Sequence, residues 1–288
     1  MSMGAPISEV VVQPPSGRLV PYLRQYVGYR YAGFQPGLHR GLPSRNLTFI
    51  ISLDRPVEMQ LAPGQDQPVS GPRFAMQAFV GGLQTWPAHI FHDGVQEGIA
   101  VELTPLGASA VLGVPGGELA GRVVALEALL GRRGRHLTER LLNTPDWPGR
   151  FRVLDHALAA GLSERHLPSD QVRTAWTRLV GRPGDLDVDA LAREVGWSRR
   201  HLTEQVHRQI GLPPRQIARI LRFERSCALL RLPATRARTM TDLALAAGYF
   251  DHAHMLHEWQ RLAGCTPAAW LDEELPPVQD ESEEDRAS

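Results

Sequence analysis

The stretch Leu191-Ala192-Arg193-Glu194-Val195-Gly196-Trp197-Ser198 decides the fold of the C-terminal part of this chain. A closely similar stretch recurs as Leu243-Ala244-Leu245-Ala246-Ala247-Gly248-Tyr249. In each copy a Leu-Ala pair is followed, after three residues, by a glycine and an aromatic residue. Each copy lies where one helical segment ends and another begins. The sequence therefore predicts two successive units, each made of two helices joined by a tight turn.

The residue types at each turn suit this geometry. Gly196 and Gly248 can adopt the left-handed conformation that ends a helix tightly. Ser198 and Asp251 follow as residues that cap the start of the second helix. The alanine of each copy is small enough to let the two helices cross closely. Such a unit presents its second helix to the major groove of DNA.

The composition of the 288 residues, with 43% hydrophobic and 22% charged residues, is typical of a soluble globular protein of two domains. No apolar run approaches the ~20 residues of a membrane span, and the N-terminus lacks the pattern of a signal peptide. The two cysteines suit a reduced, cytoplasmic protein without a membrane partner. All 31 basic residues are arginine, which suits contacts to phosphate and guanine, although a GC-rich genome also explains this usage.

Local patterns predict an α+β chain. The N-terminal part would form a small β-barrel or sandwich with following helices, and the C-terminal part an all-α domain of two helix-turn-helix units joined by a linking helix. Short strands are expected at 27–31, 47–53, 57–61, 74–80, 88–91 and 99–103, and helices at 19–26 and 118–130. The expected division is a flexible N-terminus (1–16), a regulatory, effector-binding or dimerisation domain (17–162), a linker (163–170), a DNA-binding domain (171–275) and a disordered acidic tail (276–288).

Residues ~170–273 resemble the DNA-binding domain of the AraC/XylS family of bacterial transcription regulators. The resemblance rests on both repeated stretches, on His201-Leu202, on the segment Arg219-Ile220-Leu221-Arg222-Phe223-Glu224-Arg225, and on the run Trp259-Gln260-Arg261-Leu262-Ala263-Gly264-Cys265-Thr266-Pro267. It implies a sequence-specific regulator without enzymatic activity. The phenylalanine usual in each recognition helix is replaced by Val206 and Trp259. Glu204 stands where relatives often carry a groove-facing arginine or another polar residue.

The N-terminal part resembles the regulatory domain of some members of the same family. The carrying stretch is Gly107-Ala108-Ser109-Ala110-Val111-Leu112-Gly113-Val114-Pro115, followed by Glu118-Leu119. The resemblance implies a module that senses an effector or mediates dimerisation. Double-stranded DNA is thus the expected partner, and RNA polymerase, a small-molecule effector and a second copy of the chain are candidate further partners. No cofactor is expected.

Helical spacing predicts which side chains of the second helices meet DNA. The candidates for base-edge contacts are Arg200, Thr203, Glu204, His252, Ala253 and His257. The candidates for phosphate contacts are Arg199, Arg208, Arg215, Arg236 and Arg238. The alternative for each is a merely solvated polar face.

Other chemistry finds less support in the N-terminal part. Aromatic residues on the predicted strands could line a ligand cavity or simply fill the core: Phe49, Phe79, Trp86 and Phe91. His89 and His92 suggest a metal site, but residues three apart on a strand point to opposite faces, so neither a metal site nor a catalytic residue is expected. The alternative function is a small-molecule-binding or metal-dependent enzyme in the N-terminal barrel, with a vestigial helical domain.

Overall fold

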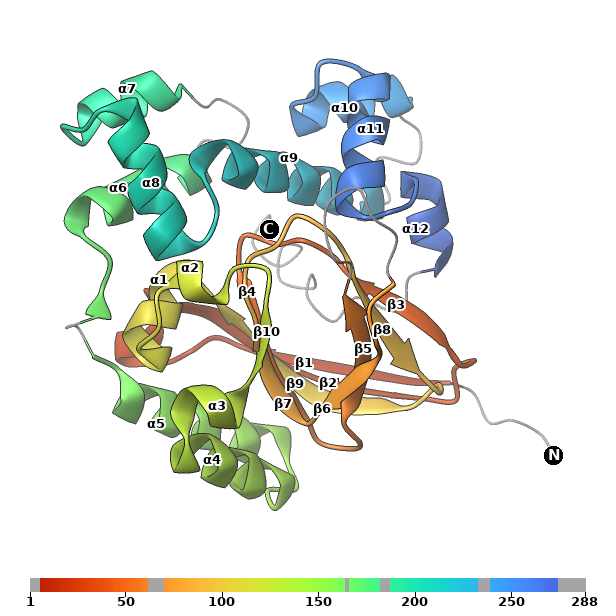
Figure 1. Cartoon of the computed structure of the whole chain (residues 1–288). Coiled ribbons are helices and arrows are strands. Elements are labelled where there is room, and N and C mark those ends of the chain that lie inside the picture. The colour runs from red at the N-terminus through yellow and green to blue at the C-terminus, as the bar shows by residue number, and fades with distance from the viewer. Residues whose placement is uncertain (1–5, 62–69, 164–165, 182–186, 233–238, 274–288) are drawn as a thin grey trace.

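The computed structural model describes residues 6–61, 70–163, 166–181, 187–232 and 239–273. The chain is an α+β protein in which two antiparallel sheets come first and helices follow (Figure 1). The larger sheet has the order β1 (Ile7–Gln13), β2 (Leu23–Ala32), β9 (Gln96–Leu103), β4 (Leu47–Ser52), β7 (Ala78–Gly81), β10 (Val123–Ala125). The smaller sheet has the order β3 (Gly37–Gly41), β8 (Ala88–His92), β5 (Val57–Leu61), β6 (Phe74–Met76).

The large sheet is buried on both faces because its central strands direct apolar side chains to both sides. On β2, Tyr29 and Tyr31 join a cluster with residues of the small sheet, such as Met59. Leu23 and Tyr26, also on β2, join the main core on the opposite side. The two sheets form a sandwich rather than a closed barrel.

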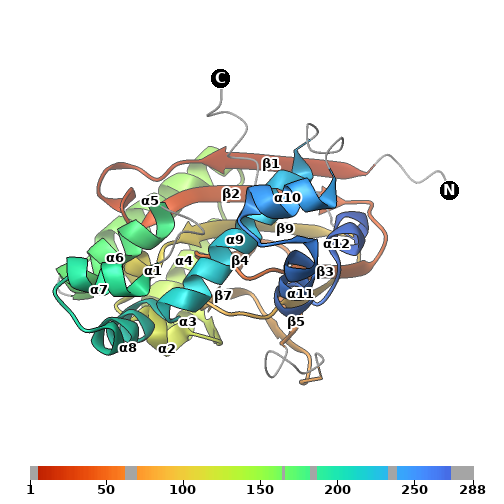
Figure 2. The ribbon, with the colours of Figure 1, turned by 90° about the horizontal axis from the view of Figure 1, so that it is seen from above.

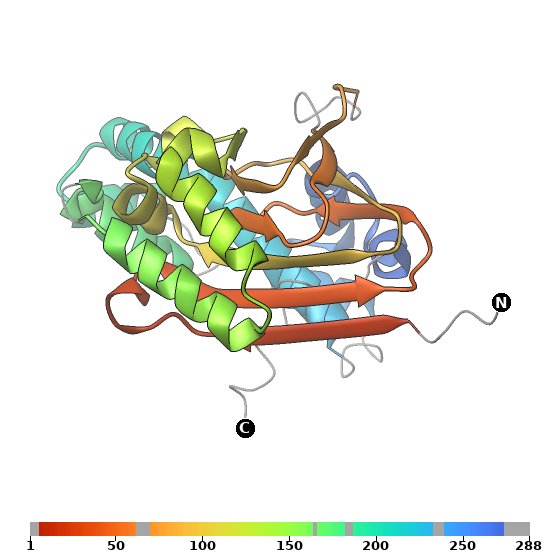
Figure 3. The ribbon, with the colours of Figure 1, turned by 90° about the horizontal axis from the view of Figure 1, so that it is seen from below.

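Helices cover the second face of the large sheet, as Figure 3 shows from below. These are α3 (Leu126–Leu130), α4 (Arg132–Leu142) and α5 (Trp147–Gly161). In α5, Phe151, Leu154 and Leu158 are buried at helical spacing, and the Phe151 ring stacks on Tyr26 with centroids 5.9 Å apart. Two short helices precede them, α1 (Pro105–Gly107), which continues as a π-helical turn over Ala108–Leu112, and α2 (Gly116–Leu119).

The C-terminal part contains the two predicted helix pairs. The first comprises α7 (Val188–Glu194) and α8 (Arg199–Ile210), preceded by α6 (Asp170–Gly181). The second comprises α10 (Met240–Ala247) and α11 (His252–Leu262), followed by α12 (Pro267–Glu273). The linking helix α9 (Pro214–Arg231) runs between them across the sheets, with one unit near each of its ends (Figures 1 and 2).

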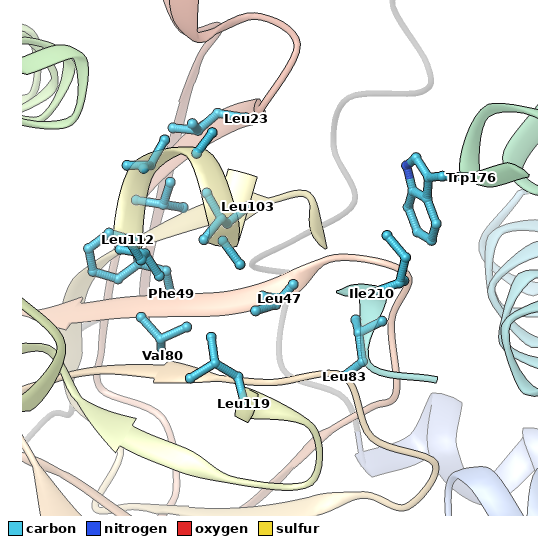
Figure 4. Close-up of a cluster of buried hydrophobic side chains, with 14 of the residues drawn as sticks. Leu23, Leu47, Phe49, Val80, Leu83, Leu103, Leu112, Leu119, Trp176 and Ile210 are labelled. Carbon is cyan, nitrogen blue, oxygen red and sulfur yellow. The ribbon is translucent and has the colours of Figure 1, made fainter. Parts of the chain in front are cut away.

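The first unit shares its core with the N-terminal domain. Trp176 of α6 and Ile210 of α8 belong to the same buried cluster as Leu47 and Leu83, and Figure 4 shows them facing one another. The second unit has a separate cluster around Trp259. The buried apolar surface is therefore continuous across the expected boundary at 163–170.

Two glycines bring α2 against the last turn of α8. A Cβ on Gly116 would lie 2.2 Å from the carbonyl oxygen of Ile210, and one on Gly117 would lie 2.2 Å from that of Arg208. Any side chain larger than hydrogen would force these backbones apart. The backbone of α2 therefore packs directly on the backbone of α8, which places the first unit against the N-terminal domain.

Several local expectations were wrong. Residues Ile7–Gln13, expected to be flexible, form the edge strand β1, because Val10, Val11 and Val12 suit pairing with β2. The helix expected at 19–26 is a single 3-10 turn that gives way to β2. The helix expected at 118–130 is interrupted by β10, whose three residues pair with β7. The strand expected at 74–80 is two strands, β6 and β7, in different sheets.

Within the described residues, no helix is both long and apolar enough to cross a membrane. The expected acidic tail at 276–288 lies outside the described residues, as do residues 1–5 of the expected flexible N-terminus.

Candidate nucleic-acid interface and the adjacent cavity

The two turns are built alike. The N–H group of Trp197 donates to the carbonyl of Ala192 at 2.9 Å, and that of Tyr249 donates to the carbonyl of Ala244 at 2.9 Å. Each turn passes through a left-handed glycine, with φ of 74° in the first unit and 92° in the second. The repeated pattern therefore produces the same backbone geometry twice.

Both recognition helices begin with a side-chain cap. The hydroxyl of Ser198 accepts from the N–H of His201 at 3.2 Å at the start of α8. The carboxylate of Asp251 accepts from the N–H of His254 at 2.7 Å at the start of α11. Each cap satisfies a backbone N–H group that has no partner within the first turn, and it fixes the residue at which the helix begins.

The first turns of α8 present the predicted base-edge side chains to solvent. Arg200 is 89% exposed, and its Nε donates to Oε1 of Glu204 at 2.8 Å, which raises the pKa of the arginine. Thr203 is half-buried, and its hydroxyl donates to the carbonyl of Arg199 at 2.9 Å. The structure thus gathers all three candidates on one face and pairs two of them.

On α11 the corresponding face is less polar. Ala253 and His257 are exposed, whereas His252 is half-buried. Among the phosphate candidates, Arg199, Arg208 and Arg215 are exposed, and Arg199 lies 3.4 Å from a carboxylate oxygen of Asp189. The remaining candidates, Arg236 and Arg238, lie outside the described residues.

Two polar contacts anchor α11 on α9, and sequence reasoning missed both. Arg219 Nε donates to Oε2 of Glu258 at 2.7 Å, with the Glu258 side chain only 7% exposed. The indole N–H of Trp259 donates to the hydroxyl of Ser226 at 2.9 Å. A signal for the first contact was present, because Glu258 shares the buried face of α11 with Met255 and Leu262 at helical spacing.

A cavity of about 470 Å³ lies between the sheets and α9. Its apolar wall comes from both sheets and includes Ile50, Val57, Met59, Phe79 and Ala100. Its lining also includes five arginines: Arg24, Arg40, Arg45, Arg225 and Arg231. The cavity is therefore amphipathic and directly adjoins α9, the helix that joins the two helix pairs.

Only one of the four aromatic cavity candidates lines this space. Phe79 does so, whereas Phe49 is fully buried in the main core. Phe91 lines a second pocket on the small sheet. Trp86 packs its ring close to Gly121.

The loop before β4 and the end of β3 connect this cavity to the C-terminal helices. The backbone N–H of Arg45 donates to Oε1 of Glu224 on α9 at 2.7 Å, and Arg45 Nε donates to Oε2 at 2.5 Å. Arg40 Nε donates to Oε2 of Glu273 on α12 at 2.7 Å. Charged side chains of the cavity lining thus hold α9 and α12 against the sheets.

Glu102 is a buried carboxyl group in the cavity wall. Its burial raises its pKa to about 7, and the nearby Arg24 only partly offsets this effect. Gln25 Nε2 donates to Glu102 Oε1 at 2.8 Å. The charge of the cavity wall therefore changes near neutral pH.

Three histidines of the small sheet have pKa values below the ordinary value, whereas the pKa of Glu102 is raised. Burial lowers the pKa of His39 to about 4, aided by His92 and Arg231, and burial also lowers the pKa values of His89 and His92. These side chains are therefore neutral at physiological pH. Within the described ranges, no three His, Cys, Asp or Glu side chains gather where they could hold a metal ion.

Comparisons with known proteins give the following matches. Residues 191–273 match the family model of a helix-turn-helix domain, and no curated protein matches the chain. A Chromobacterium violaceum transcriptional regulator with an AraC-type DNA-binding domain is 22% identical, with a TM-score of 0.33, over 37% of this chain and 95% of that chain.

Two structures of ToxT from Vibrio cholerae strain SCE256 match nearly the whole chain. An apo variant is 8% identical, with a TM-score of 0.50, over 91% of this chain and 99% of that chain. The wild-type form, described as bound to an unsaturated fatty acid, is 7% identical, with a TM-score of 0.48, over 95% and 97%. At such identity the likeness of the apo variant bears on the fold alone. Residues 191–273 of this chain therefore form a helix-turn-helix domain of the kind found in DNA-binding transcription regulators.

Proposed function

We propose that α8 and α11 read two successive major-groove segments on one face of a DNA duplex, and that the N-terminal domain controls this reading. The observation that carries the proposal is the repeated turn, in which the same hydrogen bond of 2.9 Å precedes a capped and exposed helix in both units. The two segments would lie about one helical turn, or ~34 Å, apart.

The pairing on α8 suggests how the first segment is read. Arg200 can donate to guanine and Glu204 can accept from the amino group of cytosine. Because Glu204 already orients Arg200, the two side chains would contact neighbouring base pairs with little loss of side-chain entropy. Thr203 would contact either a base or a phosphate. On α11, His252, Ala253 and His257 are the corresponding candidates.

The arginines predicted to contact phosphate would supply the affinity that does not depend on sequence. If Arg199, Arg208, Arg215, Arg236 and Arg238 each neutralise one phosphate, affinity should fall about five hundredfold between ~50 and ~200 mM salt. The measurement starts from duplexes selected out of random DNA by the full-length protein, and follows their binding by fluorescence anisotropy across this salt range.

Matched variants separate the two kinds of contact. Arg208→Ala should weaken binding to all sequences alike and reduce the salt slope by about one unit. Arg200→Ala should change the preferred bases of one block only. Binding that hardly responds to salt, or selection that enriches no sequence, would refute this mechanism and favour a function of the N-terminal domain alone. A doubled site would indicate a homodimer, and RNA polymerase is a further candidate partner for a regulator bound at such a site.

We also propose that the amphipathic cavity holds a small-molecule effector, with an apolar body against the sheets and a polar or anionic end near the arginines. Support comes from the position of the cavity, because its lining includes Arg45 and Glu224, which connect the sheets to α9. An occupant there would act on the contact that holds α9 against the sheets.

An anionic apolar probe tests this cavity. Anilinonaphthalene sulfonate should bind one site per chain, with fluorescence enhancement. Ala228→Trp, which places an indole on the cavity side of α9, should weaken that binding at least tenfold, a change of about 1.4 kcal/mol. Ala190→Trp, on the exposed face of α7, is the matched control and should leave probe binding unchanged. Equal binding by both variants would place the probe elsewhere.

A further inference from the structure

The turn of the second unit contains one residue more than the turn of the first. In the first unit the aromatic Trp197 is followed directly by the cap, Ser198. In the second unit Tyr249 makes the same hydrogen bond as Trp197, but Phe250 intervenes before the cap, Asp251. The additional residue is therefore Phe250.

Phe250 is 85% exposed, more than any other large hydrophobic side chain in the described part of the chain. An exposed ring forgoes the stabilisation that its burial would give. The ring is therefore accessible to a partner molecule.

The backbone of Phe250 is held firmly on both sides. Tyr249 is buried, with its ring edge-on to His254 at a centroid distance of 5.4 Å. Asp251 caps α11, and the N–H of Phe250 itself donates to Nδ1 of His254 at 3.4 Å. The ring thus projects from a fixed position at the N-terminal end of the recognition helix.

That end of a recognition helix is the part that approaches base edges in a major groove. The exposed surface beside it includes another apolar side chain, Ala253, while the carboxylate of Asp251 is engaged as the cap. Phenylalanine and alanine contact the C5-methyl group of thymine, the one apolar feature that the major groove displays. The first unit instead presents Arg199 and Arg200 at its corresponding end.

We propose that Phe250 is a specificity-determining residue that contacts a thymine methyl group in the DNA segment read by α11. This inference rests on the proposed DNA reading and extends it from polar side chains to an apolar one. The two units would then recognise bases by different chemistry. Charged side chains of α8 would contact polar base edges, and Phe250 at the start of α11 would contact a thymine methyl group.

Replacing single thymines by deoxyuridine tests the inference, because the exchange removes only the methyl group. On the selected duplex, full-length wild-type protein should lose about fourfold in affinity at one or two thymines of the second block. Phe250→Ser should weaken binding to the unmodified duplex by at least the same factor and should no longer respond to deoxyuridine at those positions. Phe250→Leu keeps an apolar contact and should retain part of the response.

Leu245→Ser is the matched control, because Leu245 is an exposed apolar residue of α10 outside the turn. Its deoxyuridine profile should equal that of the wild type. Identical profiles for wild type and Phe250→Ser, or a second block without thymine, would overturn the inference. The inference would also be overturned if Phe250→Ser bound DNA as tightly as the wild type but no longer bound a protein partner of the wild type. Failure of the wild type to enrich any sequence would instead overturn the proposed DNA reading itself, and this inference with it.

Discussion

Replacing Arg219 with methionine is expected to lower the free energy of unfolding by about 3–5 kcal/mol, because Glu258 then stays buried without its partner. The carboxylate accepts from Arg219 at 2.7 Å and has a side chain only 7% exposed. Methionine retains much of the aliphatic volume, so the loss reports mainly on the charge. Urea denaturation followed by tryptophan fluorescence measures it.

Two further variants distinguish this effect from a general loss of packing. Arg219→Met combined with Glu258→Leu should recover most of the lost stability, since an apolar pair of similar volume commonly replaces a buried ion pair without cost. Arg178→Met breaks an exposed pair with Glu194 of similar length, 2.6 Å, and should change stability by less than about 1 kcal/mol. Equal losses for Arg219→Met and Arg178→Met would show that the buried pair has no special role.

Arg219→Met should also weaken the DNA sequence preference of the second unit but not that of the first. Because Arg219 anchors α11 on α9, its removal frees the second recognition helix while α8 keeps its contact with α2. In the DNA selection, the block read by α11 should lose its sequence preference before the block read by α8.

Glu102→Gln is expected to reduce the dependence of stability on pH between pH 5 and pH 8. In the folded protein burial raises the pKa of Glu102 from its ordinary value of 4.5 to about 7. The folded state then binds a proton more tightly than the unfolded state, so this contribution is present below the ordinary pKa and is lost as pH rises through 7. The expected loss in the wild type is about 2 kcal/mol over this interval.

Glutamine suits the comparison because its amide oxygen can still accept from Gln25, which lies 2.8 Å from Glu102 in the wild type. The variant should therefore be more stable than the wild type at pH 8 and close to it at pH 5. Denaturation curves at several pH values provide the measurement. Parallel declines in both proteins would mean that Glu102 ionises normally or that other groups dominate.

The local chemistry of the C-terminal units made them predictable from the sequence. Gly196, Ser198, Gly248 and Asp251 each specify a turn or a cap within a few residues, and the helices found there follow those signals. The exposure of Arg200, Glu204 and Ala253 likewise follows from helical periodicity alone. Their contacts with DNA remain predictions.

The N-terminal part was less predictable because its short strands depend on distant partners. The apolar residues of 118–130 follow the spacing of a helix, yet Val123–Ala125 within this segment forms a strand that pairs with β7. The cavity is lined mostly by aliphatic and small side chains of several strands, so a search for aromatic residues found only Phe79. The contact Arg45–Glu224 joins segments far apart in the chain, and no local pattern indicates it. For Arg219–Glu258, helical spacing places Glu258 on the buried face of α11 but does not indicate its partner.

The close approach of Gly116 and Gly117 to the carbonyls of Ile210 and Arg208 gives the two recognition helices unequal freedom. Helix α8 is fixed by main chain and by a shared core, so a rigid-body movement of the first unit must carry the N-terminal domain with it. Helix α11 packs in a different core, shared with the C-terminal half of α9, and is held there by side-chain contacts. The boundary between the two buried cores therefore lies along α9, between Leu221 and Phe223, and not at the expected linker.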